Sequence, residues 1–272
     1  MDLQIKLSSK LYAVDLRNPI DLSIPLDFNG SQPNTYNVPN ATAKAYEDGT
    51  FVGDTRRGGS CNFEEYRLVP HCNGTHTEGV GHIALERISV HRIAPTGLIP
   101  ATLITISPEA ANTTSDTYVP QKGTGDFLLT RKNLENALRR QREYFHTALI
   151  IRTLPNDASK KSRRYMETPP PFFSFQAMEY INTRNVQHLL VDLPSIDRTF
   201  DEGKLSGHHT YWNVVQGSHD VDPTTHSLRT ITEMIYVPME VADGSYLLNL
   251  HVAPFVGDAA PSRPLLYLLQ EL

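Results

Sequence analysis

The sequence contains few cysteines, little excess charge and no long apolar run, and each of these features excludes a class of protein. Only Cys61 and Cys72 carry thiols among its 272 residues, too few for the disulfide framework of a small secreted domain. We therefore expect both cysteines to be free. No apolar stretch approaches the roughly 20 residues that a membrane-spanning helix requires. The N-terminus lacks a basic segment followed by an apolar one, so we expect no signal peptide and a cytoplasmic location.

Positive charge is also scarce. The formal net charge is −5, whereas a protein that binds nucleic acid needs a basic surface to neutralise phosphates. We therefore expect a small-molecule substrate as the partner, and neither nucleic acid nor a membrane. One basic cluster, Lys-Lys-Ser-Arg-Arg at residues 160–164, could bind an anion, but a solvated loop is the simpler interpretation.

The pattern of apolar residues predicts a mixed α/β protein. Short alternating patterns and apolar runs predict strands, and apolar residues at helical spacing predict two helices, the second capped by Ser174. Strands alternate with helices in the second half, as in α/β folds, and nothing requires a second domain. The predicted strands fall within residues 11–26, 63–69, 83–92, 101–106, 147–153, 188–193, 230–237 and 246–253, and the helices cover residues 134–145 and the residues after 174.

The densest group of chemically active side chains lies in residues 71–82, which read His-Cys-Asn-Gly-Thr-His-Thr-Glu-Gly-Val-Gly-His. Cysteine and histidine are ligands for borderline metals, and glutamate adds a hard oxygen ligand. On a regular strand Cys72, His76 and Glu78 would point to one face, because side chains alternate with period two. A tight loop would also keep them within reach of one ion. This stretch therefore predicts half of a metal site.

Such a site can support catalysis if a proton carrier lies nearby. Three protein ligands leave coordination positions open for water and substrate. The ion lowers the pKa of its bound water and polarises a substrate carbonyl. His82, six residues beyond His76, titrates near neutral pH and is the candidate general acid/base. The alternative for His82 is a histidine that only hydrogen-bonds the backbone.

The run from residue 73 to residue 82 resembles the signature of the cyclase-like family of metal-dependent hydrolases, which includes bacterial kynurenine formamidase and isatin hydrolase. The usual pattern of this family is His-x-Gly-Thr-His-x-Asp-x-Pro-x-His. Residues 74–76, Gly-Thr-His, and His82 match that pattern in place, whereas Glu78 stands where the family has aspartate.

The first ligand of the family pattern is replaced in this chain. Counting four residues back from His76 leads to Cys72, where the family has histidine. Because cysteine is a competent zinc ligand, Cys72 is the preferred candidate. His71, one residue earlier, is the alternative if a local bulge brings its side chain inward.

The resemblance covers residues 19 to 238 and implies ligands far from the motif. In the family a histidine and a downstream glutamate complete the metal site. His208 falls at the position of that histidine, with His209 as the close alternative, and Glu233 is the matching glutamate. Apolar neighbours predict that Glu233 is buried, and a buried carboxylate needs a partner.

The resemblance implies a swivelling β/β/α fold in one domain spanning residues 1–272, and a homo-oligomer. It also implies a divalent metal, zinc or manganese, and hydrolysis of an amide, cyclic amide or lactone-type bond. Metal-bound hydroxide would be the nucleophile and His82 the general acid/base, with Arg56 or Arg57 as an anchor for an anionic substrate. The implied ligands are Cys72, His76, Glu78, His208 and Glu233.

Two other functions remain open at this point. A member of the same fold could bind a metal or a small molecule without catalysis, because the first histidine and the aspartate of the pattern are replaced. A third possibility makes Cys72 the nucleophile of a thiol hydrolase, activated by a nearby histidine.

Overall fold

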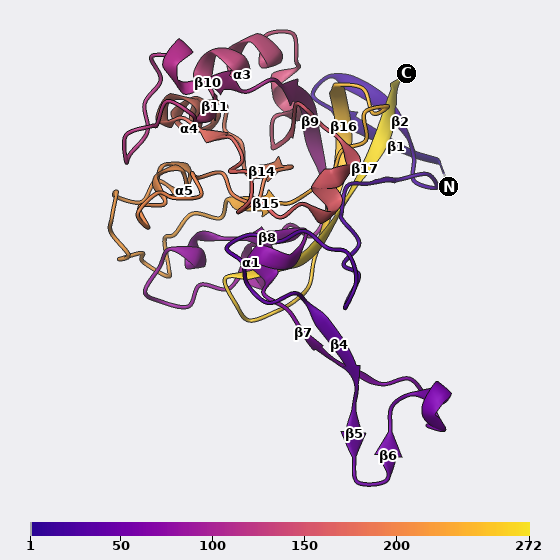
Figure 1. Ribbon diagram of the computed structural model, residues 1–272. Coiled ribbons are helices and arrows are strands. Elements are labelled where there is room, and N and C mark those ends of the chain that lie inside the picture. Colours follow the sequence, from indigo (N-terminus) through magenta and orange to yellow (C-terminus); the bar gives the residue numbers. More distant parts are fainter. Residues whose placement is uncertain (1) are drawn as a thin grey trace.

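Seven strands of the computed structural model, which describes residues 2–272, close into a barrel (Figure 1). The hydrogen-bonded order is β17, β16, β9, β12, β14, β15 and β8, and β8 pairs with β17 again to complete the ring. These strands are β8 (His76–Glu78), β9 (Leu98–Ile106), β12 (Ala148–Thr153), β14 (His188–Val191), β15 (Thr230–Glu233), β16 (Gly244–Val252) and β17 (Ala259–Glu271).

Parallel strands form one side of the barrel and antiparallel strands form the other. Strands β9, β12, β14 and β15 run parallel to one another, whereas β8, β16 and β17 join them in antiparallel pairs. All six residues of β12 are buried, as expected for a strand that is covered on both faces. The predicted α/β class is therefore confirmed.

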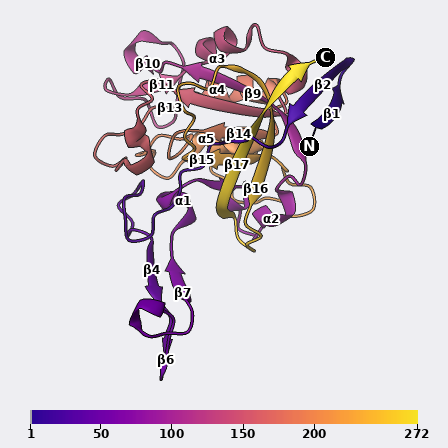
Figure 2. The same cartoon turned by 90° about the vertical axis from the view of Figure 1, so that its right-hand side faces the viewer.

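Helices cover the outer face of the parallel strands (Figures 1 and 2). Leu134 of α3 (Arg131–Leu138) and Met178 of α4 (Phe175–Thr183) belong to one core cluster with Leu149 of β12. Ile150, the next residue along β12, lies in a second cluster inside the barrel, because successive side chains of a strand point to opposite faces.

Side-chain caps fix where the two predicted helices begin. The Ser174 hydroxyl accepts a hydrogen bond from the Ala177 amide, so Ser174 is the N-cap of α4, as predicted. Thr130 and Asn133 form a capping box at the start of α3. The first predicted helix is shorter than expected, because α3 ends at Leu138 and Phe145 lies in a separate 3₁₀ turn.

The predicted strand at residues 83–92 is wrong. This segment contains no strand and ends in the short helix α2 (Val90–Ile93), which follows the 3₁₀ turn η2 (Val80–His82). Among the elements that were not predicted are α5 (Ser206–Trp212) and β17, the longest described strand.

A narrow arm projects from the barrel (Figures 1 and 2). It consists of two small hairpins, β4 (Thr42–Ala45) with β7 (Glu64–Arg67) and β5 (Glu47–Asp48) with β6 (Phe51–Val52), and the turn η1 (Thr55–Arg57). All four residues of β7 are exposed. Tyr46, Phe51 and Phe63 pack their rings together within the arm.

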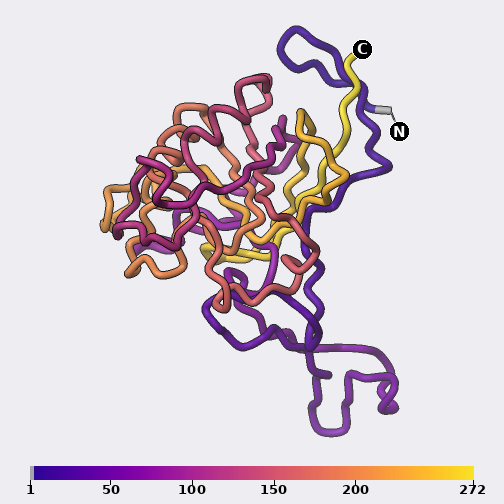
Figure 3. The backbone as a smooth tube through the Cα atoms, turned by 45° about the horizontal axis from the view of Figure 1, so that its top comes forward, coloured from indigo at the N-terminus to yellow at the C-terminus, as the bar shows by residue number. Residues whose placement is uncertain are grey.

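The two ends of the described chain lie on the same side of the molecule (Figure 3). The N-terminal hairpin pairs with the last residues of β17, with Val14 opposite Leu269. The remaining short elements are β1 (Asp2–Leu7), β2 (Lys10–Asp15), β3 (Ile20–Asp21), α1 (Pro70–Asn73), β10 (Glu109–Ala110), η3 (Ala111–Thr113), β11 (Phe127–Leu129), η4 (Glu143–Phe145), η5 (Ala158–Ser162) and β13 (Phe172–Phe173).

Within residues 2–272, no helix is both long enough and apolar enough to cross a bilayer.

Candidate metal centre

Strand pairing brings the motif and the distant glutamate together. β8 pairs with β15 in antiparallel register, which sets Glu233 directly opposite His76. His76 and Glu78 point to one face of β8, as the period-two spacing predicts. Thr77 points to the other face, where its hydroxyl lies 2.7 Å from that of Thr232. The closed barrel therefore explains how residues 157 positions apart in the chain meet, from position 76 to position 233.

His76 is held with one ring nitrogen free. Its Nδ1 lies 3.0 Å from the Gly74 carbonyl oxygen, and because a carbonyl can only accept, Nδ1 carries the hydrogen. The other nitrogen, Nε2, is then an acceptor, yet it is buried and makes no hydrogen bond with any described residue. Glu233 Oε2 lies 3.4 Å from it. A buried lone pair of this kind suits a metal ion.

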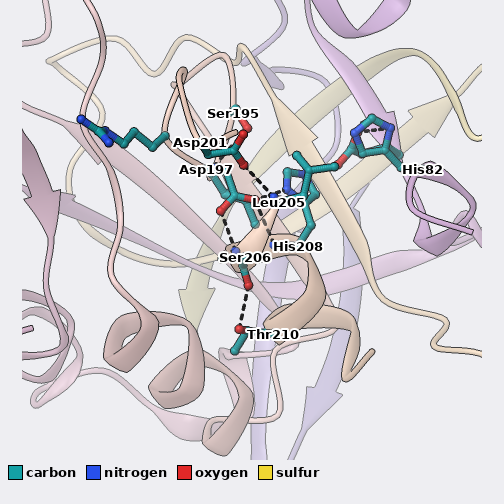
Figure 4. A network of polar contacts seen from close by, with 12 residues as sticks. His82, Ser195, Asp197, Asp201, Leu205, Ser206, His208 and Thr210 are labelled. Atoms are coloured by element: carbon teal, nitrogen blue, oxygen red, sulfur yellow. Dashed lines mark hydrogen bonds and ion pairs between the residues drawn. The ribbon is translucent and has the colours of Figure 1, made fainter. Parts of the chain in front are cut away.

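His208 faces Glu78 from the opposite side of the cluster, on α5. Its Nε2 lies 2.8 Å from Glu78 Oε1, and its Nδ1 lies 2.5 Å from Asp197 Oδ2 (Figure 4). Asp197 also accepts hydrogen bonds from the backbone amides of Gly207 and His208 and from the Tyr118 hydroxyl. A carboxylate that fixes the orientation of a histidine is typical of metal-ligating histidines.

Glu233 is buried, as its apolar neighbours predict. Its Oε1 accepts a hydrogen bond of 2.9 Å from the Ile196 amide and lies 3.9 Å from His208 Nε2. Only one of its two oxygens therefore has a backbone donor. The second oxygen faces His76, which leaves it available to a cation.

His71, His82 and Asp258 form the solvent side of the cluster. His71 Nδ1 lies 2.9 Å from Glu78 Oε2, and its Nε2 lies 2.8 Å from Asp258 Oδ2. The rings of His71 and His82 stack with their centroids 4.3 Å apart. The side chains of both histidines are 25% exposed, whereas that of Glu78 is completely buried. His82 can therefore exchange protons with solvent, which suits a proton carrier.

The charges in the cluster shift the pKa values of its members. Burial disfavours the charged form of His208, but Glu78 and Asp197 outweigh burial and raise the pKa of His208 well above its ordinary value. Burial also opposes ionisation of Glu78, yet the charges of His82 and His208 hold the pKa of Glu78 well below its ordinary value. Hydrogen bonds to Asp258 and Glu78 overcome the burial of His71 and raise its pKa to about 10.

The donor set has the composition of a site for a divalent transition metal. Imidazole nitrogens and carboxylate oxygens are common ligands of zinc and manganese. The ligand atoms of His71, His76 and Glu78 lie within 4.8 Å of one another, and so do those of Glu78, His82 and His208. These distances and the free Nε2 of His76 fit a bound cation, which would neutralise the carboxylates.

The structure brings most of the residues implied by the motif into one cluster: His76, Glu78, His82, His208 and Glu233. Cys72 differs, because it lies on α1 rather than on the strand of His76 and Glu78, and among the described residues no hydrogen bond joins its buried thiol to a histidine. Burial first and the charge of Glu233 second raise the pKa of that thiol to about 11. The choice of Cys72 over His71 as a ligand stays a prediction. Both cysteines are free, as expected.

Three other candidate groups lie outside the cluster. His209 is buried with its ring centroid 6.2 Å from that of His219, and among the described residues it forms no hydrogen bond or ion pair with Glu78 or Glu233. Arg56 and Arg57 lie on the projecting arm, where they pair with Asp54 and Glu47 respectively. Neither arginine is placed near the cluster, so the expected anchor for an anionic substrate is not supported.

Asp258 was not predicted as a site residue. It lies 176 positions after His82 in the chain, and no local pattern marks it. The only available signal is its place immediately before β17, whose pairing with β8 cannot be read from sequence spacing. The contact between Asp197 and His208 was not predicted either.

The chain matches the model of the Cyclase family, described as "Putative cyclase", over residues 20–198. This range contains the motif and Asp197 and ends before His208 and Glu233. Among curated proteins, none matches the sequence.

Similar solved structures share the fold at low identity. The predicted metal-dependent hydrolase from Bacillus stearothermophilus is 17% identical, with a TM-score of 0.56 over 92% of this chain and 98% of that one. An isatin hydrolase bound to the product analogue thioisatinate is 14% identical, with a TM-score of 0.59 over 93% of each chain. Isatin hydrolase A from Ralstonia solanacearum is 17% identical, with a TM-score of 0.57 over 92% of each chain.

The sequence match, the shared fold and the geometry of the cluster agree. The family model covers more than half of the 272 residues, and the resemblance seen in residues 73–82 is therefore confirmed. The chain belongs to the Cyclase family.

Proposed function

We propose that this protein is a metal-dependent hydrolase of an amide, a cyclic amide or a lactone-type bond. The observation that carries the proposal is the buried Nε2 of His76, whose lone pair has no hydrogen-bond partner among the described residues and faces Glu233. An unsatisfied buried polar atom costs about 1–3 kcal/mol, and a cation bound between His76 Nε2 and Glu233 Oε2 would remove that cost.

The proposed ligands are His76, Glu78, His208 and Glu233, with Cys72 as the fifth. Cysteine is a competent zinc ligand, and the Cys72 thiol is buried and free of a disulfide, so Cys72 is the proposed fifth ligand. His71 is the alternative, because its ligand atom lies within 4.8 Å of those of His76 and Glu78.

When bound, a divalent cation polarises a substrate carbonyl and lowers the pKa of a coordinated water. The chain's own residues supply the rest. Glu78 and Glu233 are buried carboxylates that face histidines, and Asp197 keeps the His208 ring in one orientation. His82, at the solvent side, accepts a proton from the attacking water and donates it to the leaving nitrogen or oxygen.

The bond class comes from the proteins that share the fold. Two of the similar structures are named isatin hydrolases, and isatin is a cyclic amide. We therefore propose cyclic amides as the first substrates to test, with formamides and lactones next. Zinc is the proposed metal, with manganese as the alternative, because the donor set contains both imidazole and carboxylate groups.

Two other functions are less well supported. A thiol hydrolase needs a histidine beside its nucleophile, but no described histidine hydrogen-bonds the Cys72 thiol. A non-catalytic binding protein would have no need for His82 at the solvent side of the metal ligands. Its placement beside Glu78 and Asp258 favours catalysis.

The test is elemental analysis of the purified protein together with hydrolysis assays on isatin, other cyclic imides, formamides and lactones. We expect a divalent metal at one or two ions per chain, and turnover of at least one compound that a chelator abolishes. His82→Ala should bind metal normally but lose activity, whereas His251→Ala, an exposed histidine on β16, should keep it. Equal activity of His82→Ala and the wild type would contradict the mechanism.

The proposal also includes a homo-oligomer. A two-stranded ribbon is at best marginally stable in water by itself, and β7 of the projecting arm exposes all four of its residues. A second copy of the chain would cover this ribbon. Light scattering of the wild type should give a mass above that of one chain, and deletion of residues 42–67, which removes the whole ribbon, should lower it.

A further inference from the structure

Asp258 reaches the cluster because of the strand that follows it. β17 pairs with β8 in antiparallel register, with Ala259 opposite Glu78. The Gly79 amide donates a hydrogen bond of 3.1 Å to the Asp258 carbonyl oxygen, which extends the pairing by one step. The backbone at Asp258 is therefore fixed beside the motif, although the residue is distant in sequence.

The Asp258 carboxylate contacts two histidines through one oxygen. Its Oδ2 lies 2.8 Å from His71 Nε2 and 3.3 Å from His82 Nδ1. An ionised carboxylate can only accept hydrogen bonds. Each of the two facing ring nitrogens therefore carries a hydrogen.

This contact fixes which nitrogen of His82 can take up a proton. With the hydrogen on Nδ1, the lone pair of the neutral ring is on Nε2, on the other side of the imidazole. The orientation of the ring is further restricted by stacking on His71, at a centroid distance of 4.3 Å and an angle of 29° between the planes. His71 itself is held between Glu78 and Asp258.

We propose that Asp258 is the positioning residue of His82: it holds the imidazole in the Nδ1–H form, so that Nε2 is the nitrogen that takes up and releases a proton. This inference rests on the proposed role of His82 as the proton carrier. It assigns Asp258 no contact with the metal. Asp258 lies outside residues 20–198, the part of the chain that matches the family model.

A double-mutant cycle on the metal-loaded protein tests this role. Asp258→Asn removes the charged acceptor but keeps the size of the side chain. Loss of an outer partner of a functional histidine costs about 10- to 100-fold, and we expect that loss in kcat, with KM changed by less than about threefold. In the His82→Ala background the same substitution should cause almost no further loss of kcat, because the imidazole that Asp258 positions is absent.

The matched control is Asp48→Asn, an exposed aspartate on β5 of the arm, which should leave kcat unchanged. Metal content and thermal midpoint are measured for every variant. If Asp258→Asn lowers kcat equally with and without His82, Asp258 does not act through His82 and the inference is wrong. It is also wrong if Asp258→Asn loses the metal, since Asp258 would then be a ligand.

Nitrogen NMR of histidine-labelled, metal-loaded protein gives a readout that needs no substrate. We expect His82 to show a protonated Nδ1 in the wild type and to lose this form in Asp258→Asn. A wild-type His82 protonated only on Nε2 would overturn the inference. If the wild type hydrolyses no compound of the panel, the proposed function fails, and the NMR result decides the contact with Asp258 independently.

Discussion

Two buried groups of charged side chains lie at the same edge of the barrel, and they are built differently. Thr153, Asp192 and Glu233 stand at or just after the carboxyl ends of the adjacent parallel strands β12, β14 and β15. Asp192 pairs with Lys160, and we call Lys160, Asp192 and Thr153 the lysine cluster. Glu233 belongs to the metal centre.

In the lysine cluster every charge is satisfied by the protein. Lys160 Nζ donates to Asp192 Oδ2 at 2.7 Å and to the carbonyl and hydroxyl oxygens of Thr153 at 2.8 and 2.9 Å. Asp192 also accepts hydrogen bonds from the Thr153 amide and hydroxyl at 2.9 and 2.8 Å. A cluster with complete pairing has no capacity left for a ligand.

The metal centre has more acidic groups than cations to pair with them. Burial disfavours the charged forms in both clusters. In the lysine cluster burial outweighs the attraction between the two charges, because the pKa of Lys160 is lowered and that of Asp192 is raised. In the metal centre the carboxylates prevail over burial and raise the pKa of His208. The excess of acidic groups and the Nε2 of His76 without a hydrogen bond distinguish the metal centre, which can still bind a cation, from the lysine cluster, whose ion pair is complete.

The largest expected effect concerns the unpaired nitrogen. His76→Ala should remove the metal and lower the rate of hydrolysis by at least about 10³-fold, because metal polarisation of the carbonyl contributes several kcal/mol. The same substitution should have only a small effect on the free energy of unfolding of the metal-free protein. Metal analysis, initial rates and urea unfolding check these outcomes. If His76→Ala is severely destabilised but keeps its metal, His76 stabilises the fold instead of binding a cation, and the contrast drawn between the two clusters is wrong.

Asp192→Asn should strongly lower the stability of the fold and leave metal binding intact. Removing one partner of a buried ion pair leaves an uncompensated charge and costs about 3–5 kcal/mol of unfolding free energy. The fraction that remains folded should still bind metal. Glu65→Gln on the arm, whose partner Lys44 is exposed, serves as the control and should be neutral in the same urea titration.

A second variant separates charge from packing in the lysine cluster. Replacing both partners, as Lys160→Met with Asp192→Leu, should restore most of the lost stability, because a buried ion pair is often no better than well-packed apolar residues. If the double variant is as unstable as Asp192→Asn, the cluster stabilises the fold through more than its ion pair.

The sequence predicted local features of the fold and of the site, because these depend on neighbouring residues. The apolar run at residues 147–153 became β12, and Ser174 caps α4. The spacing of His76 and Glu78 placed both side chains on one face of a strand. In each case periodicity or side-chain chemistry within a few residues determines the structure.

Features that depend on distant contacts were missed. β17 contains Pro261 and Pro264, and proline inside a run argues against a strand, yet long-range pairing with β8 and β16 forms it. α5 has no apolar periodicity, and its first turn is held by Asp197. Lys160 stands in a run of basic residues that predicts a solvated loop, but its partner Asp192 comes from another strand and buries it.

His188, a histidine outside the metal centre and the lysine cluster, should have a smaller effect on the stability of the fold, and this effect should depend on pH. Burial lowers the pKa of His188 to about 4 from an ordinary value of 6.5, so the unfolded chain binds more protons between these values. Stability should therefore fall as the pH drops from about 6.5 to 4, with His188 contributing roughly 2 kcal/mol. Urea unfolding across this range measures it, and His188→Asn should flatten the curve. Unchanged pH dependence in this variant would show that other groups are responsible.

The smallest expected effect decides between the two candidates for the remaining ligand. Because Cys72, whose thiol is buried and free of a disulfide, is the proposed ligand and His71 the alternative, Cys72→Ser should weaken metal binding about tenfold, and His71→Gln should weaken it less. Competition with a chelating dye measures both affinities, and the thermal midpoint of each variant controls for folding. The reverse order would make His71 the ligand. It would also mean that the cation takes the place of the hydrogen on His71 Nδ1, which faces Glu78, while Nε2 keeps its hydrogen toward Asp258. The metal centre would then be completely paired once it is loaded, as the lysine cluster is without an ion.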